Sequence, residues 1–111
     1  MITNKPIVWL YGQVKTPLFS AEARVEAGVL LRKLQKGEHL RMPHNRPIPT
    51  IGARCFELRI VDKVATWRIM YKIYSDAIVI GEVFKKKDRT TPKKVIEVCK
   101  RRYKKFDEVV K

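Results

Sequence analysis

The chain has 111 residues, 45% of them hydrophobic, with 25 Lys and Arg against 11 Asp and Glu, which gives a formal net charge of +14. This hydrophobic fraction is too high for a disordered chain, and the length is typical of one globular domain, so we expect a single domain over residues 1–111. No apolar run approaches the ~20 residues of a membrane span, and the first residues form no apolar leader. Together these features predict a cytoplasmic protein that does not bind membranes.

Between its ends, the first half of the chain predicts a strand, a helix and a long loop. Residues 7–11 are a short apolar run of strand-forming side chains. Ser20 is a candidate N-cap, and apolar residues then recur at helical spacing as far as Gly37, which is placed to end a helix. Residues 38–53 contain three prolines and follow neither periodicity. We therefore expect a long loop there, of a kind that often carries function.

The second half predicts three strands and a final helix. Residues 55–61 and 66–74 alternate between apolar and polar side chains, while residues 77–84 are almost all apolar, as in a strand covered on both faces. The links between them are short enough for hairpins, which favours an antiparallel meander. Thr91 and Pro92 then provide an N-cap and a first helical residue. The resulting order, β–α–loop–β–β–β–α, is that of an α+β domain.

The positive charge is concentrated at the C-terminal end. Residues 85–111 hold 12 of the 25 basic side chains and 4 of the 11 acidic ones, a local excess of eight positive charges. Such a charge predicts a polyanionic partner, and nucleic acid is the commonest one. An acidic protein is the second possibility. An anionic membrane surface ranks third and last, because no stretch of the sequence joins its cations to the wide apolar face that membrane binding needs.

The side chains that most often carry enzymatic chemistry are scarce. Cys55 and Cys99 lie in apolar surroundings without the spacing of a zinc site, so we expect buried, reduced thiols. Glu57 and Glu82 are the only acidic residues inside the predicted strands, which argues against a nuclease that gathers carboxylates around metal ions. Motifs for phosphate loops, dinucleotides and catalytic serines are absent, so we expect neither a metal nor another cofactor.

Cations on strands are the chemistry that the sequence does offer. If Arg59 and Arg68 pair across the first hairpin, they share one face, and a lysine run at residues 85–87 begins where the last strand ends. Arginines fixed on strands beside lysines would form a preorganised anion site. The alternative is that Glu57 pairs with Arg59 or Arg68 on an ordinary solvated surface. The lysines of the final helix are expected to form a solvated face with non-specific electrostatic reach.

Five segments, in this order and spacing, resemble the RelE/ParE toxin superfamily and, within it, the HigB-like, phage-derived branch. The segments are Glu57-Leu58-Arg59, Trp67-Arg68-Ile69-Met70-Tyr71, Ile78-Val79-Ile80, Phe84-Lys85-Lys86-Lys87 and Thr91-Pro92. The resemblance covers about residues 47–106. It implies a RelE-like fold, in which a small curved antiparallel sheet is packed by an N-terminal and a C-terminal helix.

The resemblance also implies a function. Members are toxins of bacterial type II toxin–antitoxin systems, and many cut mRNA in the ribosomal A site without a metal ion, whereas the ParE branch poisons gyrase. The partners would be mRNA, the ribosome and a cognate antitoxin, which in the HigB-like branch is often a helix-turn-helix protein. We therefore expect a metal-independent, ribosome-dependent mRNA endoribonuclease that inhibits translation.

Individual residues can be matched to the family's motif. Arg68 matches a strand arginine that contacts the scissile phosphate, Arg59 matches the basic residue of the preceding strand, and a basic pair follows the last strand. The resemblance thus predicts the catalytic residues Arg59, Arg68, Lys85 and Lys86, and Arg89 matches a further arginine that some members use. With Arg89, we expect Lys87, Lys93 and Lys94 to bind RNA. Several relatives have a Tyr or His near the last strand or the C-terminal helix for proton transfer. Here no His follows His44, and Tyr103 falls on the apolar stripe of the helix, so the acid and the base stay open, with Lys85 or Lys86 as candidates.

Three other functions remain open from the residues alone. The domain could be a non-catalytic basic module that binds RNA or the ribosome, with its cations on phosphates. It could poison gyrase, as the ParE branch does. It could also be a phage remnant that only docks an antitoxin-like protein.

Overall fold

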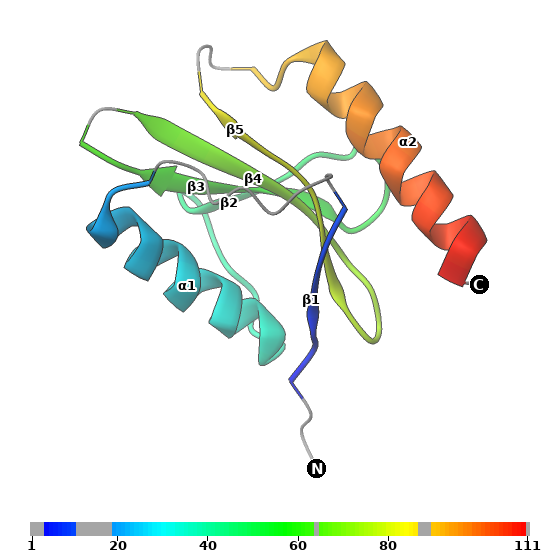
Figure 1. Ribbon diagram of the computed structural model, residues 1–111, viewed down its shortest axis with the longest axis horizontal. Helices are drawn as coiled ribbons and strands as arrows, with labels where there is room; N and C mark the ends of the chain where they lie inside the picture. The colour runs from blue at the N-terminus through cyan, green and yellow to red at the C-terminus, as the bar shows by residue number, and fades with distance from the viewer. Residues whose placement is uncertain (1–3, 11–18, 64, 87–89, 111) are drawn as a thin grey trace.

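The computed structural model describes residues 4–10, 19–63, 65–86 and 90–110. Its elements are β1 (Ile7–Trp9), α1 (Ala21–Gln35), β2 (Asn45–Pro47), β3 (Cys55–Val61), β4 (Thr66–Ile73), β5 (Ile78–Lys85) and α2 (Lys93–Val110). The strands form one five-stranded sheet in the order β1-β5-β4-β3-β2. The two helices pack on opposite faces of this twisted sheet, α1 on one and α2 on the other (Figure 1). The predicted α+β fold with an N-terminal and a C-terminal helix is confirmed.

The antiparallel meander is also confirmed, but the sheet as a whole is mixed. β3, β4 and β5 pair antiparallel in sequence order, whereas β1 pairs parallel with β5, so that Ile7 lies opposite Ile78. The expectation of a purely antiparallel sheet is therefore wrong. The direction of a strand depends on which partner it meets, and alternation within the strand does not encode this.

Within the predicted loop at residues 38–53 lies a strand that the sequence analysis missed. β2 has three residues, pairs antiparallel with β3 and places Arg46 opposite Glu57. It lies at the edge of the sheet, where Pro47 is tolerated because one side of an edge strand needs no backbone donor. Tyr71 donates its hydroxyl proton to the Asn45 side chain, which ties this short strand to the core.

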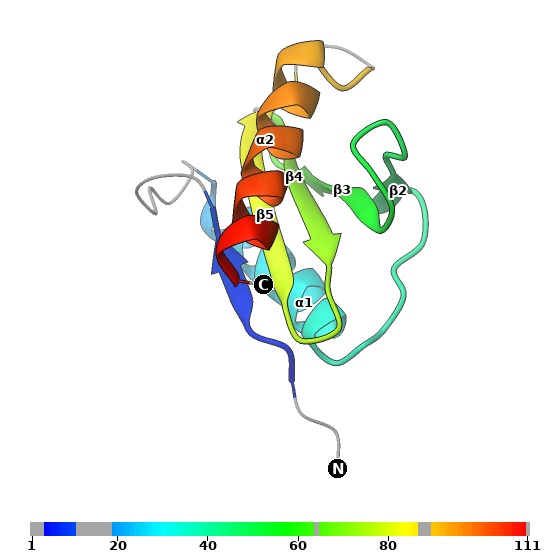
Figure 2. The same ribbon diagram turned by 90° about the vertical axis from the view of Figure 1, so that its right-hand side faces the viewer.

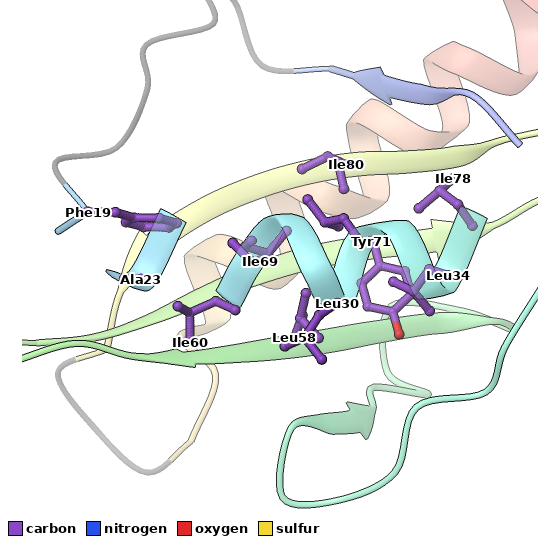
Figure 3. Packing of buried hydrophobic residues seen from close by; sticks show 12 residues of the cluster. Phe19, Ala23, Leu30, Leu34, Leu58, Ile60, Ile69, Tyr71, Ile78 and Ile80 are labelled. Carbon is purple, nitrogen blue, oxygen red and sulfur yellow. The ribbon is translucent and has the colours of Figure 1, made fainter. Parts of the chain in front are cut away.

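The face of the sheet under α1 holds the larger core. Alternate residues of β3 and β4, such as Leu58 and Ile69, point into it and meet the apolar stripe of α1 (Figure 3). Ser20 caps this helix by accepting a hydrogen bond from the Ala23 amide at 3.1 Å, and Gly37 follows its end with a φ of 88°. The predicted helix and its boundaries are confirmed.

On the other face, α2 packs over β5 through an apolar stripe and is fixed by polar anchors. Cys99 and Tyr103 are buried in the second core cluster, as the helical spacing predicted. Arg102 donates to the backbone oxygen of Gly81 at 2.6 Å, and Tyr74 donates its hydroxyl proton to Asp107 at 2.7 Å. These contacts hold α2 in a fixed position along the sheet. Neither described helix is both long and apolar enough to span a bilayer.

Both cysteines are buried free thiols. Burial raises the pKa of Cys99 to about 12 and also raises the pKa of Cys55. Neither side chain is therefore a thiolate near neutral pH, and the expectation of structural, reduced thiols is confirmed.

Candidate functional site

Arg59 and Arg68 face each other across β3 and β4, as predicted. Directly opposite residues of an antiparallel pair project to the same face of the sheet, here the face that also carries α2. On the neighbouring strand β5, Phe84 lies opposite Arg68. The Lys86 amide donates to the Thr66 backbone oxygen at 2.7 Å, so Lys86 lies opposite Thr66. It therefore projects to the same face as Phe84, two residues before it.

The register corrects one prediction, the placement of Lys85. Lys85 lies opposite Trp67, whose side chain packs against the α1-side core, so Lys85 projects from the other face of the sheet and is exposed. The register shift beside Met70 and Tyr71 is the reason, because it reverses the alternation along β5: Ile80 faces α1 before the shift, and Val83 and Lys85 face α1 after it. Lys85 therefore does not join the arginines, whereas Lys86 does.

A cleft of about 180 Å³ opens at this end of the sheet. Its lining residues are Met42, Pro43, Arg46, Glu57, Arg59, Arg68 and Lys86. Four of these are cationic, and among the described residues only one lining side chain is a carboxylate. The cleft therefore carries a formal excess of three positive charges, which suits a phosphate.

Glu57, the single carboxylate of the cleft, joins three segments of the chain. Its side chain lies 3.4 Å from Arg46 Nη2 of β2 and 3.3 Å from Arg68 Nη1 of β4. It also accepts a hydrogen bond of 2.8 Å from the Thr91 hydroxyl, just before α2, and Arg46 donates to the same hydroxyl at 3.3 Å. A buried carboxylate is costly unless paired, so these contacts account for its place in the cleft.

Arg68 is buried against Glu57 rather than displayed to solvent. The Arg68 residue is only 3% exposed and Glu57 only 5%. Burial lowers the pKa of the Arg68 guanidinium, and the neighbouring Glu57 carboxylate opposes this shift. The alternative expected from the sequence, a pairing of Glu57 with a strand arginine, is confirmed for Arg68. The solvated surface expected for that pair is wrong, because both residues are buried in the cleft wall.

Arg59 differs from its neighbour. It is half-buried and lines the cleft, whereas Arg68 is buried against Glu57. A guanidinium must be reached from solvent to bind an anion that enters the cleft. Of the two strand arginines, Arg59 is thus the better placed to receive an anion.

The other predicted RNA-binding residues are distributed differently. Lys87 and Arg89 lie outside the described residues. Lys93 and Lys94 are exposed in the first turn of α2 and are not among the residues that line the cleft. The structure therefore gathers Arg59, Arg68 and Lys86 from the predicted set.

Two residues of the site were missed by the sequence analysis. Arg46 lies in a strand too short to show alternation, and no local pattern separates it from the cations around it. Thr91 was predicted as an N-cap, but its hydroxyl donates to Glu57, and α2 begins at Lys93. Both residues contact a carboxylate that lies far from them in the sequence, so only the tertiary structure identifies them.

Replacing Thr91 with valine should lower the free energy of unfolding by about 1.5–3 kcal/mol, because a hydrogen bond to a buried carboxylate is lost at nearly constant volume. The same substitution at the exposed neighbour Thr90 should change it by less than about 0.5 kcal/mol. Urea unfolding of both variants measures the difference. Equal stability of the two variants would contradict the assigned role of the Thr91 hydroxyl.

Comparison with known proteins identifies the family. Residues 18–104 match the family model described as "Phage derived protein Gp49-like". None of the curated proteins matches the chain. The family match covers most of the chain and includes the α1-side core, the cleft and most of α2. The chain therefore belongs to the Gp49-like family of phage-derived proteins, a RelE/ParE-like toxin family.

Proposed function

We propose that this protein is the toxin of a type II toxin–antitoxin system and that it cleaves mRNA on the ribosome, in the manner of the HigB-like branch, with no bound metal ion. Family membership supports the toxin assignment. The cleft supports the chemistry, because among the described residues that line it four are cationic and one is a carboxylate. This excess of positive charge carries the proposal, since an RNA phosphate would neutralise part of it.

In this proposal the substrate supplies the nucleophile. The ribose 2′-hydroxyl loses its proton to solvent and attacks the adjacent phosphorus, the bond from phosphorus to the 5′-oxygen breaks, and the 5′-oxygen takes up a proton. The products are a 2′,3′-cyclic phosphate and a 5′-hydroxyl end. Alignment of the hydroxyl with the leaving oxygen can supply roughly 7–11 kcal/mol in the best cases, and the ribosome would hold the mRNA for it. Negative charge builds up on the phosphate oxygens, which the cationic cleft would stabilise.

The residues of the cleft divide these tasks. Arg59 would contact the phosphate, with Arg46 beside it. Arg68 and Glu57 would act as positioning residues, since they pair with each other in the cleft wall and Glu57 also holds Arg46. Lys86 lines the cleft and is the residue we assign to protonation of the leaving 5′-oxygen.

The experiment that tests this proposal is induction in bacterial cells, followed by primer extension on a reporter mRNA and on the same mRNA without its ribosome-binding site. We expect growth arrest and new 5′ ends on the translated mRNA only. Ends on both mRNAs would overturn the ribosome dependence. Arrest without new ends but with altered plasmid supercoiling would replace the proposal by gyrase poisoning, and arrest with neither change would replace it by simple binding to the ribosome.

A further inference from the structure

The cleft is continued by a second hollow along α2. This hollow, of about 380 Å³, shares Arg46 with the cleft. Ile48 and Pro49, which follow β2, lie on one side of it, and Ile96 of α2 lies on the other. The two hollows are therefore neighbours, with Arg46 lining both.

A third hollow, of about 370 Å³, extends the same line. Lys100, one helical turn after Ile96, forms its α2 side, and Ile51 forms the opposite side. Figure 2 shows the elements that lie on the two sides of these hollows, α2 on one side and β2 with the loop after it on the other. We call the three hollows together the α2 groove. They follow one another from the cleft along the seam between the helix and the 48–51 segment, because Ile51 comes directly after the residues of the second hollow and Lys100 comes one turn after Ile96.

The charges of the α2 groove change along its length. Arg46 lies at its start, and the exposed Lys100 and Lys104 line its third hollow. Asp107 and Glu108 stand at the far end. A polyanion would therefore be attracted from the cleft as far as Lys104 and would leave the groove at the two carboxylates.

We propose that the α2 groove binds the single-stranded RNA that adjoins the scissile phosphate, an inference that rests on the proposed function of the cleft. The distance along the helix from Ile96 to Lys104 is about 12 Å at 1.5 Å per residue. At a spacing of ~3.4 Å per stacked nucleotide, the groove holds about three to four nucleotides beyond the cleft.

The helix offers a matched control. Arg101 and Lys105 are exposed and each follows a groove lysine by one residue, so they are turned by about 100° around the helix axis. They are not among the residues that line the three hollows. A double alanine variant at 100 and 104 and one at 101 and 105 remove the same charge from the same helix, and only the first alters the groove.

The test measures binding of 2′-O-methyl RNA, which cannot be cleaved through the 2′-oxygen, by fluorescence anisotropy at several salt concentrations. We expect the wild-type protein to bind a ten-nucleotide strand at least about tenfold more tightly than a four-nucleotide strand, through the added phosphate contacts. Lys100→Ala with Lys104→Ala should weaken binding of the longer strand about tenfold and reduce the salt slope by about 1.4, for two lost phosphate contacts. Arg101→Ala with Lys105→Ala should weaken it less than about twofold.

Two results would overturn the inference. Equal affinity for both strands, weak or strong, would show that RNA is not held beyond the cleft. Equal losses in the two double variants would show that the general charge of α2, and not the groove, attracts RNA. Cleavage in cells is scored separately, so a wild-type protein that cuts no mRNA but shows the expected binding pattern would overturn the proposed function and support the groove.

Discussion

Alanine at position 59 should lower the rate of mRNA cleavage by about 10²–10³-fold, the usual loss when one donor to a developing oxyanion is removed. Arg59 lines the cleft and is only half-buried, so its guanidinium is available to a phosphate. The measurement is the yield of cleaved reporter mRNA on ribosomes, set against Arg101→Ala as a charge-matched control on the surface of α2.

The same variant should keep its fold. Arg59 lies directly opposite Arg68, and like charges at such positions are destabilising. Relief of this repulsion should offset the lost packing of the Arg59 stem, so the free energy of unfolding should stay within about 1 kcal/mol of the wild-type value. A soluble, folded R59A protein that still cuts mRNA at the wild-type rate would remove Arg59 from the mechanism.

Replacing Arg68 with methionine, unlike the Arg59 substitution, should destabilise the protein, by about 3–5 kcal/mol. The substitution removes one partner of a buried ion pair and leaves Glu57 with Arg46 and Thr91 alone. Growth arrest should be lost because less folded protein is present. The expected loss of stability follows from the burial of the Arg68–Glu57 pair, since a solvated arginine on a strand would tolerate the same substitution.

A double variant separates loss of cleavage through unfolding from loss of cleavage through the site itself. Glu57→Leu with Arg68→Met replaces the whole pair by apolar side chains, which is often neutral for stability, so most of the lost free energy of unfolding should return. Cleavage should not return, since Arg46 has lost the carboxylate that holds it. Urea unfolding and the ribosome assay on the same preparations distinguish these effects. A double variant no more stable than R68M would show that the pair itself does not account for the loss.

Much of the fold could be predicted because the residues of β3, β4 and α1 follow the periodicity of their elements. Alternation in β3 and β4 fixed which residues face α1 and placed Arg59 and Arg68 together on the other side. The resemblance to the toxin superfamily treated Lys85 and Lys86 as a pair, whereas alternation along β5 separates them. The register shift beside Met70 and Tyr71 decides that Lys86 is the one on the arginine face, and alternation alone would have selected Lys85.

The rest of the site depends on contacts that no local pattern encodes. β2 is too short to show a period, and Pro47 is atypical of a strand. Its place follows from the pairing of Arg46 with Glu57, residues that meet only when β2 and β3 are assembled. Likewise, the sequence predicts an N-cap at Thr91, but α2 begins at Lys93 and the Thr91 hydroxyl instead donates to Glu57 of β3.

The outer strands of the sheet limit how another protein can attach to it. β1 and β2 are each three residues long, and β2 ends in a proline, which has no amide hydrogen. Binding by strand addition needs a run of unpaired backbone groups along such a border, and short strands with proline offer few of them. We therefore expect a protein that inhibits this one to bind its helices or its cationic cleft through side chains. Acidic side chains on that partner would complement the charge of the cleft best.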